Sequence, residues 1–227
     1  MPTLLDALDE MVAADAARPL LTWYRDEARV ELSGATVANW VAKTAGVLDN
    51  ELLIGPGSTV QVAAGQHWLS LVVPLAVWRV GAALVDQGPS DLLVAERIGE
   101  GTDAAERLLL PDDPFGLSRV PAPAPWQLFS ELVQAQPDRY AAPQPTSAHL
   151  AVASSPQLTH GQLADRGQAD ADALGLAAEG RLLVARTETS LDPLRCWCAT
   201  IARAGSMILA ERLTTDLANA ERADVVS

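Results

Sequence analysis

A strand, a helix and a second strand follow one another in the first half of the sequence, and this order restricts the fold more than any other feature. Residues 59–63 and 82–85 are short apolar runs typical of strands, and the helical stretch at residues 68–80 between them ends at Gly81. Glycine adopts the left-handed conformation that often ends a helix at little cost. Because strand, helix, strand is the repeating unit of a parallel sheet, the sequence predicts a layered α/β fold, with a mostly parallel sheet and flanking helices.

The same alternation continues through the rest of the 227 residues. The spacing of apolar residues predicts helices at residues 3–17, 36–48, 126–136, 159–174, 193–203 and 214–223. Further strands are predicted as a hairpin at residues 20–24 and 29–32, and at 92–95, 107–110, 150–153, 181–185, 207–210 and 224–227. We expect one domain over residues 1–227, with sub-lobes at 1–110 and 146–227 joined by a proline-rich segment at 111–145.

The composition indicates an acidic globular protein, with 49% apolar residues and a net charge of −13. Nucleic acids and anionic membrane surfaces should repel such a chain, so neither is an expected partner. The longest apolar run, residues 69–77, is too short to span a bilayer, and the first residues lack the basic segment of a signal peptide. Cys196 and Cys198 form no disulfide framework or zinc site, and we expect buried thiols in the cytoplasm, with no metal or cofactor.

The stretch AHLAVASSPQLTHGQL, residues 148–163, has the pattern of a strand, a tight turn and a helix. In nucleotide-binding α/β proteins such a turn is rich in glycine and carries a lysine, whereas this turn includes Ser154 and Ser155 and has neither. Thr159 can cap the helix, with His160 in its first turn. A weak anion site at Ser154, Ser155, Thr159 and His160 is one alternative. A serine nucleophile with His160 as base is another, although the nucleophile elbow motif is missing.

Other polar and aromatic residues have a structural and a functional interpretation. Asp112 and Asp113 are paired acids that can bind a metal ion, but a solvated turn is the commoner role. His67 and Trp68 open the helix at residues 68–80, where we favour packing. We expect the tryptophans on helix faces to lie in the core: Trp40, Trp78 and Trp197.

A series of motifs in this order resembles the AMP-binding superfamily, the adenylate-forming enzymes that include acyl-CoA synthetases. The residues GSTV at 57–60 and RVGAALV at 79–85 resemble the superfamily patterns GDRV and KAGA. The residues THGQL at 159–163, LGL at 174–176 and GSMILAERL at 205–213 resemble SHRNL, LGL and GATVVLAERF. The chain is most similar to a short actinobacterial family. The resemblance implies the N-terminal part of the adenylate-forming fold, with His67 and Trp68 near the substrate cleft.

Two departures from the superfamily affect the predicted function. The phosphate loop, [ST]SGTTGxPKG in the superfamily, is reduced to SSPQ at residues 154–157, and Lys43, the single lysine, lies in an early helix. The segments that in the superfamily carry the magnesium carboxylate, the ribose-binding aspartate and the catalytic lysine have no counterpart in these 227 residues. We therefore expect a non-catalytic protein that binds a protein partner or a second copy of itself. The alternative is a nucleotide- or acyl-binding module, or an activity completed by a second polypeptide.

Overall fold

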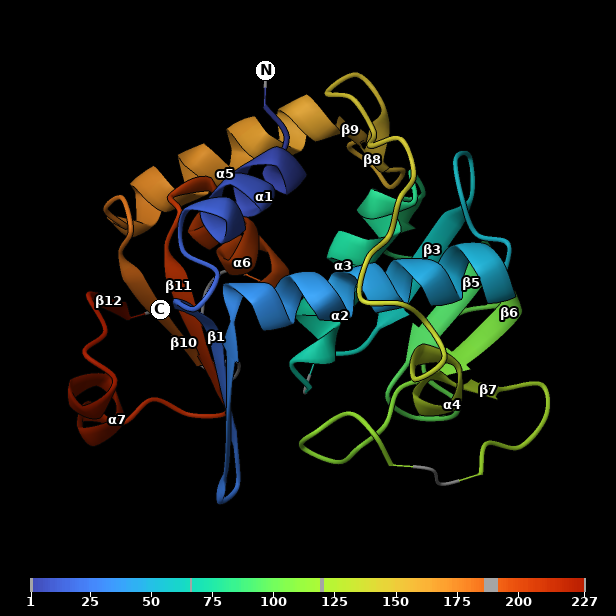
Figure 1. Cartoon of the computed structure of the whole chain (residues 1–227), viewed down its shortest axis with the longest axis horizontal. Coiled ribbons are helices and arrows are strands. Elements are labelled where there is room, and N and C mark those ends of the chain that lie inside the picture. Colours follow the sequence, from blue (N-terminus) through green and yellow to red (C-terminus); the bar gives the residue numbers. More distant parts are fainter. Residues whose placement is uncertain (1, 66, 119–120, 186–191, 227) are drawn as a thin grey trace. The chain divides into compact units, whose positions relative to one another are not determined.

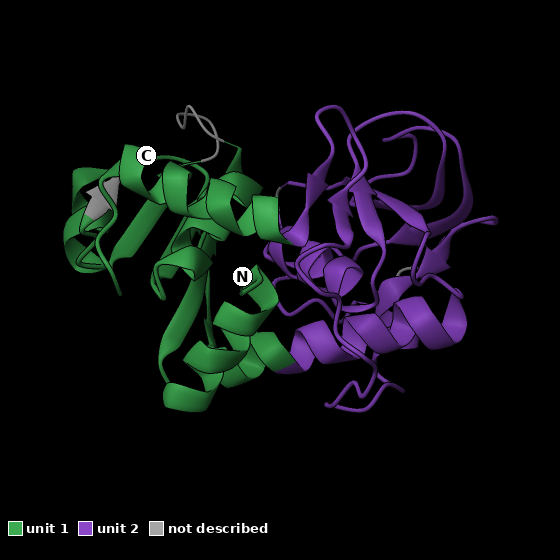
Figure 2. Cartoon of the chain, turned by 90° about the horizontal axis from the view of Figure 1, so that it is seen from above, with its two compact units in different colours: residues 1–38, 161–227 green, residues 39–160 purple. Residues whose placement is uncertain are grey.

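The computed structural model describes residues 2–65, 67–118, 121–185 and 192–226. The chain divides into two compact units (Figure 2), each with its own sheet: unit 1 comprises residues 1–38 and 161–227, and unit 2 comprises residues 39–160. These units differ from the predicted sub-lobes 1–110 and 146–227, because the N-terminal helix and hairpin group with the C-terminal third of the chain. Whether residues 1–227 behave as one domain stays a prediction.

Unit 1 contains a five-stranded sheet in the order β12-β10-β11-β1-β2 (Figure 1). All neighbours are parallel except β1 and β2, which form the predicted antiparallel hairpin. The strands are β1 (Pro19–Arg25), β2 (Ala28–Ser33), β10 (Arg181–Ala185), β11 (Ser206–Ala210) and β12 (Val225–Val226). The accompanying helices are α1 (Leu4–Ala14), α5 (His160–Leu174), α6 (Pro193–Ala202) and α7 (Thr215–Ala220).

Local signals in the sequence set the helix starts of unit 1. Thr3 caps α1 through a capping box, in which its hydroxyl accepts from the Asp6 amide and the Asp6 carboxylate accepts from the Thr3 amide. The Asp192 side chain caps α6 by accepting from the Leu194 amide, and Pro193 occupies the first helical position, where its missing N–H costs nothing. Apolar residues of α7 pack on a buried cluster of the sheet that includes Leu183 and Ile208.

Unit 2 contains a seven-stranded sheet in the order β7-β6-β5-β3-β4-β8-β9. The strands are β3 (Thr59–Ala63), β4 (Ala83–Val85), β5 (Ser90–Ala95), β6 (Ala104–Leu109), β7 (Gln127–Leu128), β8 (Leu150–Val152) and β9 (Leu158–Thr159). Only β9, at one edge, pairs antiparallel. The helices are α3 (Leu69–Arg79), α4 (Phe129–Val133) and α2 (Gly34–Gly46), which begins in unit 1 and continues as a π-helical turn at Val47–Glu51.

The structure confirms the predicted layered α/β architecture and corrects three details. The helix predicted at residues 126–136 is shorter, because Gln127 and Leu128 instead add a strand to β6. The helix predicted at residues 159–174 begins at His160, after the extra strand β9. Trp78 and Trp197 are buried as predicted, but Trp40 is only partly buried and packs its ring against Trp68. None of the helices described is long and apolar enough to cross a membrane.

Candidate functional site

The turn at residues 153–157 lies at the carboxyl end of β8, where ligands bind in open parallel sheets. Its two ends belong to paired strands, since Val152 lies opposite Leu158 and Leu150 lies opposite Thr159. The turn is therefore the connection of a β-hairpin, and the chain enters α5 only after the second strand. A phosphate loop instead leads directly from a strand into a helix, whose N-terminal amides face the anion.

The polar groups of this turn are partly engaged in holding the fold. The Ser154 hydroxyl accepts from the Asp86 amide at 2.6 Å, which fixes the turn to the end of β4. Pro156 has no N–H to donate. At the start of α5 the His160 amide donates to the His149 carbonyl oxygen at 2.9 Å, so the first amide of the helix is not directed at solvent. Ser155 is exposed.

Thr159 and His160 differ in exposure and role. Thr159 directly precedes α5, the position predicted for the cap of this helix. The His160 ring is buried and lies edge-on to the Trp78 ring, with 6.5 Å between centroids. Trp78 in turn donates its indole N–H to the Ala151 carbonyl at 3.0 Å, which ties α3 to β8. His160 is thus part of the packing between α3 and the sheet. A catalytic or anion-binding role for these residues stays a prediction.

The other polar candidates hold loops in place. His67 accepts from the Leu69 amide through Nδ1, and its Nε2 lies 2.9 Å from the Asp113 carbonyl oxygen. Burial alone would raise the pKa of Asp113, but hydrogen bonds from the amides of Ser118, Phe115 and Leu117 outweigh it and lower the pKa. The Asp113 carboxylate therefore caps the loop after β6, which supports the turn interpretation. The described residues include no cluster of three His, Cys, Asp or Glu side chains placed to hold a metal ion.

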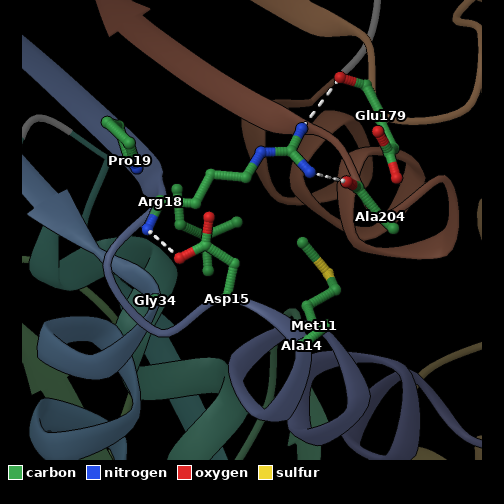
Figure 3. Close-up of a pocket in the computed structure, with 9 residues that line it drawn as sticks. Met11, Ala14, Asp15, Arg18, Pro19, Gly34, Glu179 and Ala204 are labelled. Carbon is green, nitrogen blue, oxygen red and sulfur yellow. Dashed lines mark hydrogen bonds between the residues drawn. The ribbon is translucent and has the colours of Figure 1, made fainter.

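Unit 1 has a cavity of about 290 Å³ (Figure 3) at the amino ends of β1, β10 and β11. Arg18 lines it and donates to two carbonyl oxygens, of Glu179 at 2.8 Å and of Ala204 at 3.1 Å. The Asp15 carboxylate, also at the cavity, accepts from the Arg18 amide at 3.2 Å. Glu179 and Ala204 both have positive φ, so Arg18 fastens two strained turns that lead into neighbouring strands.

A second cavity, of about 310 Å³, lies in unit 2 at the amino ends of β3, β4 and β8. It is lined largely by turn residues, among them Pro56, Gly81 and Pro143, together with His149. Both cavities thus open at the end of their sheets opposite to the one where nucleotides bind in parallel α/β folds. Their geometry offers space for a small ligand but not the arrangement of a nucleotide site.

Among the described residues, the carboxylate with the most strongly lowered pKa is Glu221, directly after α7. Burial raises its pKa, but hydrogen bonds from Arg29, Tyr24 and Arg181 prevail and lower the pKa to about 2. Glu221 lines neither of the two cavities. A carboxylate that accepts from two guanidinium groups and a hydroxyl and lies away from a cavity is typical of a structural anchor, because its oxygens are already engaged within the fold.

A comparison with known proteins identifies the family. No protein-family model matches the chain. A TIGR03089 family protein of Mycobacterium tuberculosis is 33% identical over 222 residues, which cover 92% of this chain and 89% of that protein. The chain belongs to the TIGR03089 family. This member of the family therefore has a relative of similar length.

Solved structures show the fold of this TIGR03089 family protein. The N-terminal subdomain of Klebsiella oxytoca NpsA superposes with a TM-score of 0.63 at 15% identity. A mutant form of coronafacic acid ligase from Pectobacterium brasiliense superposes with a TM-score of 0.71 at 11% identity. Both matches cover 97% of the chain, which spans only 58% and 48% of the lengths of those proteins. The fold is that of the N-terminal part of adenylate-forming enzymes, as the resemblance implied.

Proposed function

We propose that this TIGR03089 family protein is non-catalytic and acts by binding a protein, either a second copy of itself or another chain. The observation that supports it most directly is the hairpin at residues 153–157. Its Ser154 hydroxyl is engaged by the Asp86 amide, and the first amide of α5 by the His149 carbonyl. Catalysis of phosphoryl or adenylyl transfer depends on positioning and charge around the phosphates. The turn supplies neither a glycine-lined cradle nor a lysine.

The single lysine has a structural role in unit 2. Lys43 donates to the Gln136 carbonyl oxygen at 2.5 Å and pairs with Asp138 at 2.9 Å. Gln136 also accepts from Asn50 and donates to Glu51. Lys43 therefore fastens the segment after α4 to the end of α2, a use of its charge that supports the proposal of a non-catalytic protein.

Exposed apolar side chains support the binding role. The large apolar residues that the structure places at the surface all belong to unit 2: Leu53, Ile98, Phe115, Leu117 and Leu150. Phe115 is 70% exposed, although burial of such a ring would be favourable. Ile98 follows β5, and Phe115 and Leu117 follow β6, which is the neighbouring strand. Large exposed apolar side chains of this kind can contribute to a protein-binding surface. The buried free thiols of Cys196 and Cys198 support a cytoplasmic location.

The direct test is incubation of the protein with ATP, Mg²⁺ and a panel of carboxylic acids, followed by measurement of pyrophosphate and AMP. We expect no release above the level of a buffer control, while an active acyl-CoA synthetase in parallel shows that the panel is competent. Release that depends on both the acid and the protein would overturn the proposal.

The second candidate is a module that binds a small ligand without turnover, and the two cavities favour it. Their volumes of about 290 and 310 Å³ lie at the lower end of the range of ligand sites. Thermal unfolding with ATP, AMP and acyl-CoA distinguishes the candidates. A ligand at roughly a hundredfold excess over its Kd stabilises a protein by about 2.7 kcal/mol, so binding would raise the Tm measurably. We expect no rise.

A further inference from the structure

Strand β2 forms one edge of the unit 1 sheet. The sheet order ends at β2, and within the described part of the chain its pairing partner is β1. The hairpin formed by β1 and β2 extends beyond the end of β11 (Figure 1). An edge strand carries a row of main-chain N–H and C=O groups that can pair with another strand.

The hairpin geometry indicates which residues of β2 face the open edge. Arg25 lies opposite Ala28, so the turn between the two strands has only two residues. In such a hairpin the residues that flank the turn exchange hydrogen bonds, and the bonded pairs then recur at every second position. Ala28 and Val30 therefore direct their main-chain groups to β1. Arg29 and Glu31 direct theirs outward.

The side chains of β2 are self-complementary in one antiparallel register. If Val30 lies opposite Val30 of a second copy, Arg29 lies opposite Glu31 and Ala28 lies opposite Leu32 in both halves of the pair. Each charge then meets an opposite charge on one face, and each apolar residue meets an apolar residue on the other. A shift by two residues places either Arg29 against Arg29 or Glu31 against Glu31, which is unfavourable.

The two charged side chains are held close to this edge. Arg29 donates through Nε to Tyr24 and Glu221 and through Nη2 to Glu31, so its guanidinium is fixed on the face that Glu31 shares. Both side chains remain accessible, with 43% and 35% of their surfaces exposed. Because Arg29 and Glu31 already hold each other in place, they lose little conformational entropy when they pair with Glu31 and Arg29 of a second copy.

We propose that β2 is a self-association surface, which pairs antiparallel with β2 of a second copy about Val30 and joins two unit 1 sheets into one. The inference rests on the proposed role in protein binding and specifies its partner as the same chain. Because the outward main-chain groups belong to Arg29 and Glu31, these residues would also form the main-chain hydrogen bonds between the two β2 strands.

The test is sedimentation of the full chain over a wide concentration range. We expect the wild type to form a dimer, and Glu31→Arg to raise the dimer Kd at least about tenfold, because two attractive contacts become repulsive. Glu10→Arg, an equal charge change at an exposed position of α1, should leave the Kd unchanged. A monomeric wild type at every concentration, or a Kd that Glu31→Arg does not move, would overturn the inference.

A charge swap tests the register itself. Arg29→Glu alone should also raise the dimer Kd, whereas an equimolar mixture of the Glu31→Arg and Arg29→Glu proteins should form a heterodimer with both charge pairs restored. If Arg29→Glu fails to fold, because Arg29 also contacts Glu221, the series wild type, Glu31→Gln and Glu31→Arg should show a stepwise rise in Kd. Folded variants that form no heterodimer, or a series without that order, contradict the register. A dimer that forms through a surface other than β2 would contradict this inference but not the proposed function. ATP turnover would overturn the proposed function without testing the pairing of β2.

Discussion

Replacement of Glu221 by glutamine tests the energetics of the anchor between α7 and the sheet of unit 1. Its carboxylate accepts from Arg29 Nε at 2.9 Å, from Arg181 Nη2 at 2.5 Å and from the Tyr24 hydroxyl, and its side chain is 8% exposed. Glutamine keeps the shape of the side chain but loses the charge. The variant therefore leaves two guanidinium groups facing a neutral amide.

The pKa of Glu221 sets the magnitude of the effect and its dependence on pH. The pKa falls from an ordinary 4.5 to about 2, which corresponds to roughly 3 kcal/mol of stability for the ionised group. Because the folded state holds the proton less tightly than the unfolded state, this stability is fully present above pH 4.5. It decreases as the pH falls, to about 1 kcal/mol near pH 3, and is lost as the pH passes 2.

Urea unfolding of the wild type and of Glu221→Gln at pH 7, 5, 4 and 3 measures the effect (about ±10–15% on each extrapolated value). We expect a difference in unfolding free energy of about 2–3 kcal/mol at pH 7 that narrows to about 1 kcal/mol at pH 3. Glu10→Gln, at an exposed position of α1, controls for the loss of one negative charge. A difference that is the same at every pH would refute the reasoning, because the charge of Glu221 would then contribute nothing.

Two further predictions concern the core of unit 1. Gly205→Ala should lower the unfolding free energy by about 1–3 kcal/mol, because the added Cβ would lie 2.5 Å from the Gly180 carbonyl oxygen. Gly55→Ala is the control in the same urea titration: its added Cβ would lie 3.9 Å from the Val80 carbonyl oxygen, so we expect little effect. The thiols of Cys196 and Cys198 are buried, and burial raises the pKa of Cys198. A thiol reagent should therefore label them only at the rate at which the protein unfolds. Rapid labelling in native buffer would contradict this burial.

Much of the fold follows from short-range signals in the sequence. The turn glycine Gly81 has φ of +81° at the end of α3, as the predicted helix stop requires. The capping box at Thr3 and the proline at position 193 mark helix starts that the structure confirms. These features could be predicted because each depends on neighbouring residues alone.

The features that sequence reasoning missed depend on contacts between distant residues. Gln127 and Leu128 form a strand because Leu108 and Leu109 offer an unpaired edge of β6, which local apolar spacing does not reveal. Leu158 forms a strand because it pairs with Val152 across the turn. The grouping of the N-terminal hairpin with the C-terminal third also depends on one long-range pairing, that of β1 with β11.

The extra strand β9 gives a physical reason for the lack of adenylate-forming chemistry that we propose. A phosphate loop needs a strand that opens into a flexible, glycine-rich turn with free amides. In this chain Leu158 pairs back onto β8, and the Ser154 hydroxyl is fixed to the Asp86 amide, so the turn belongs to the sheet. Insertion of glycines after Pro156 would lengthen the turn without disturbing the pairing of β8 with β9. Because the site would still lack a lysine, we expect such an insertion to leave the fold intact and to create no ATP-dependent rise in Tm.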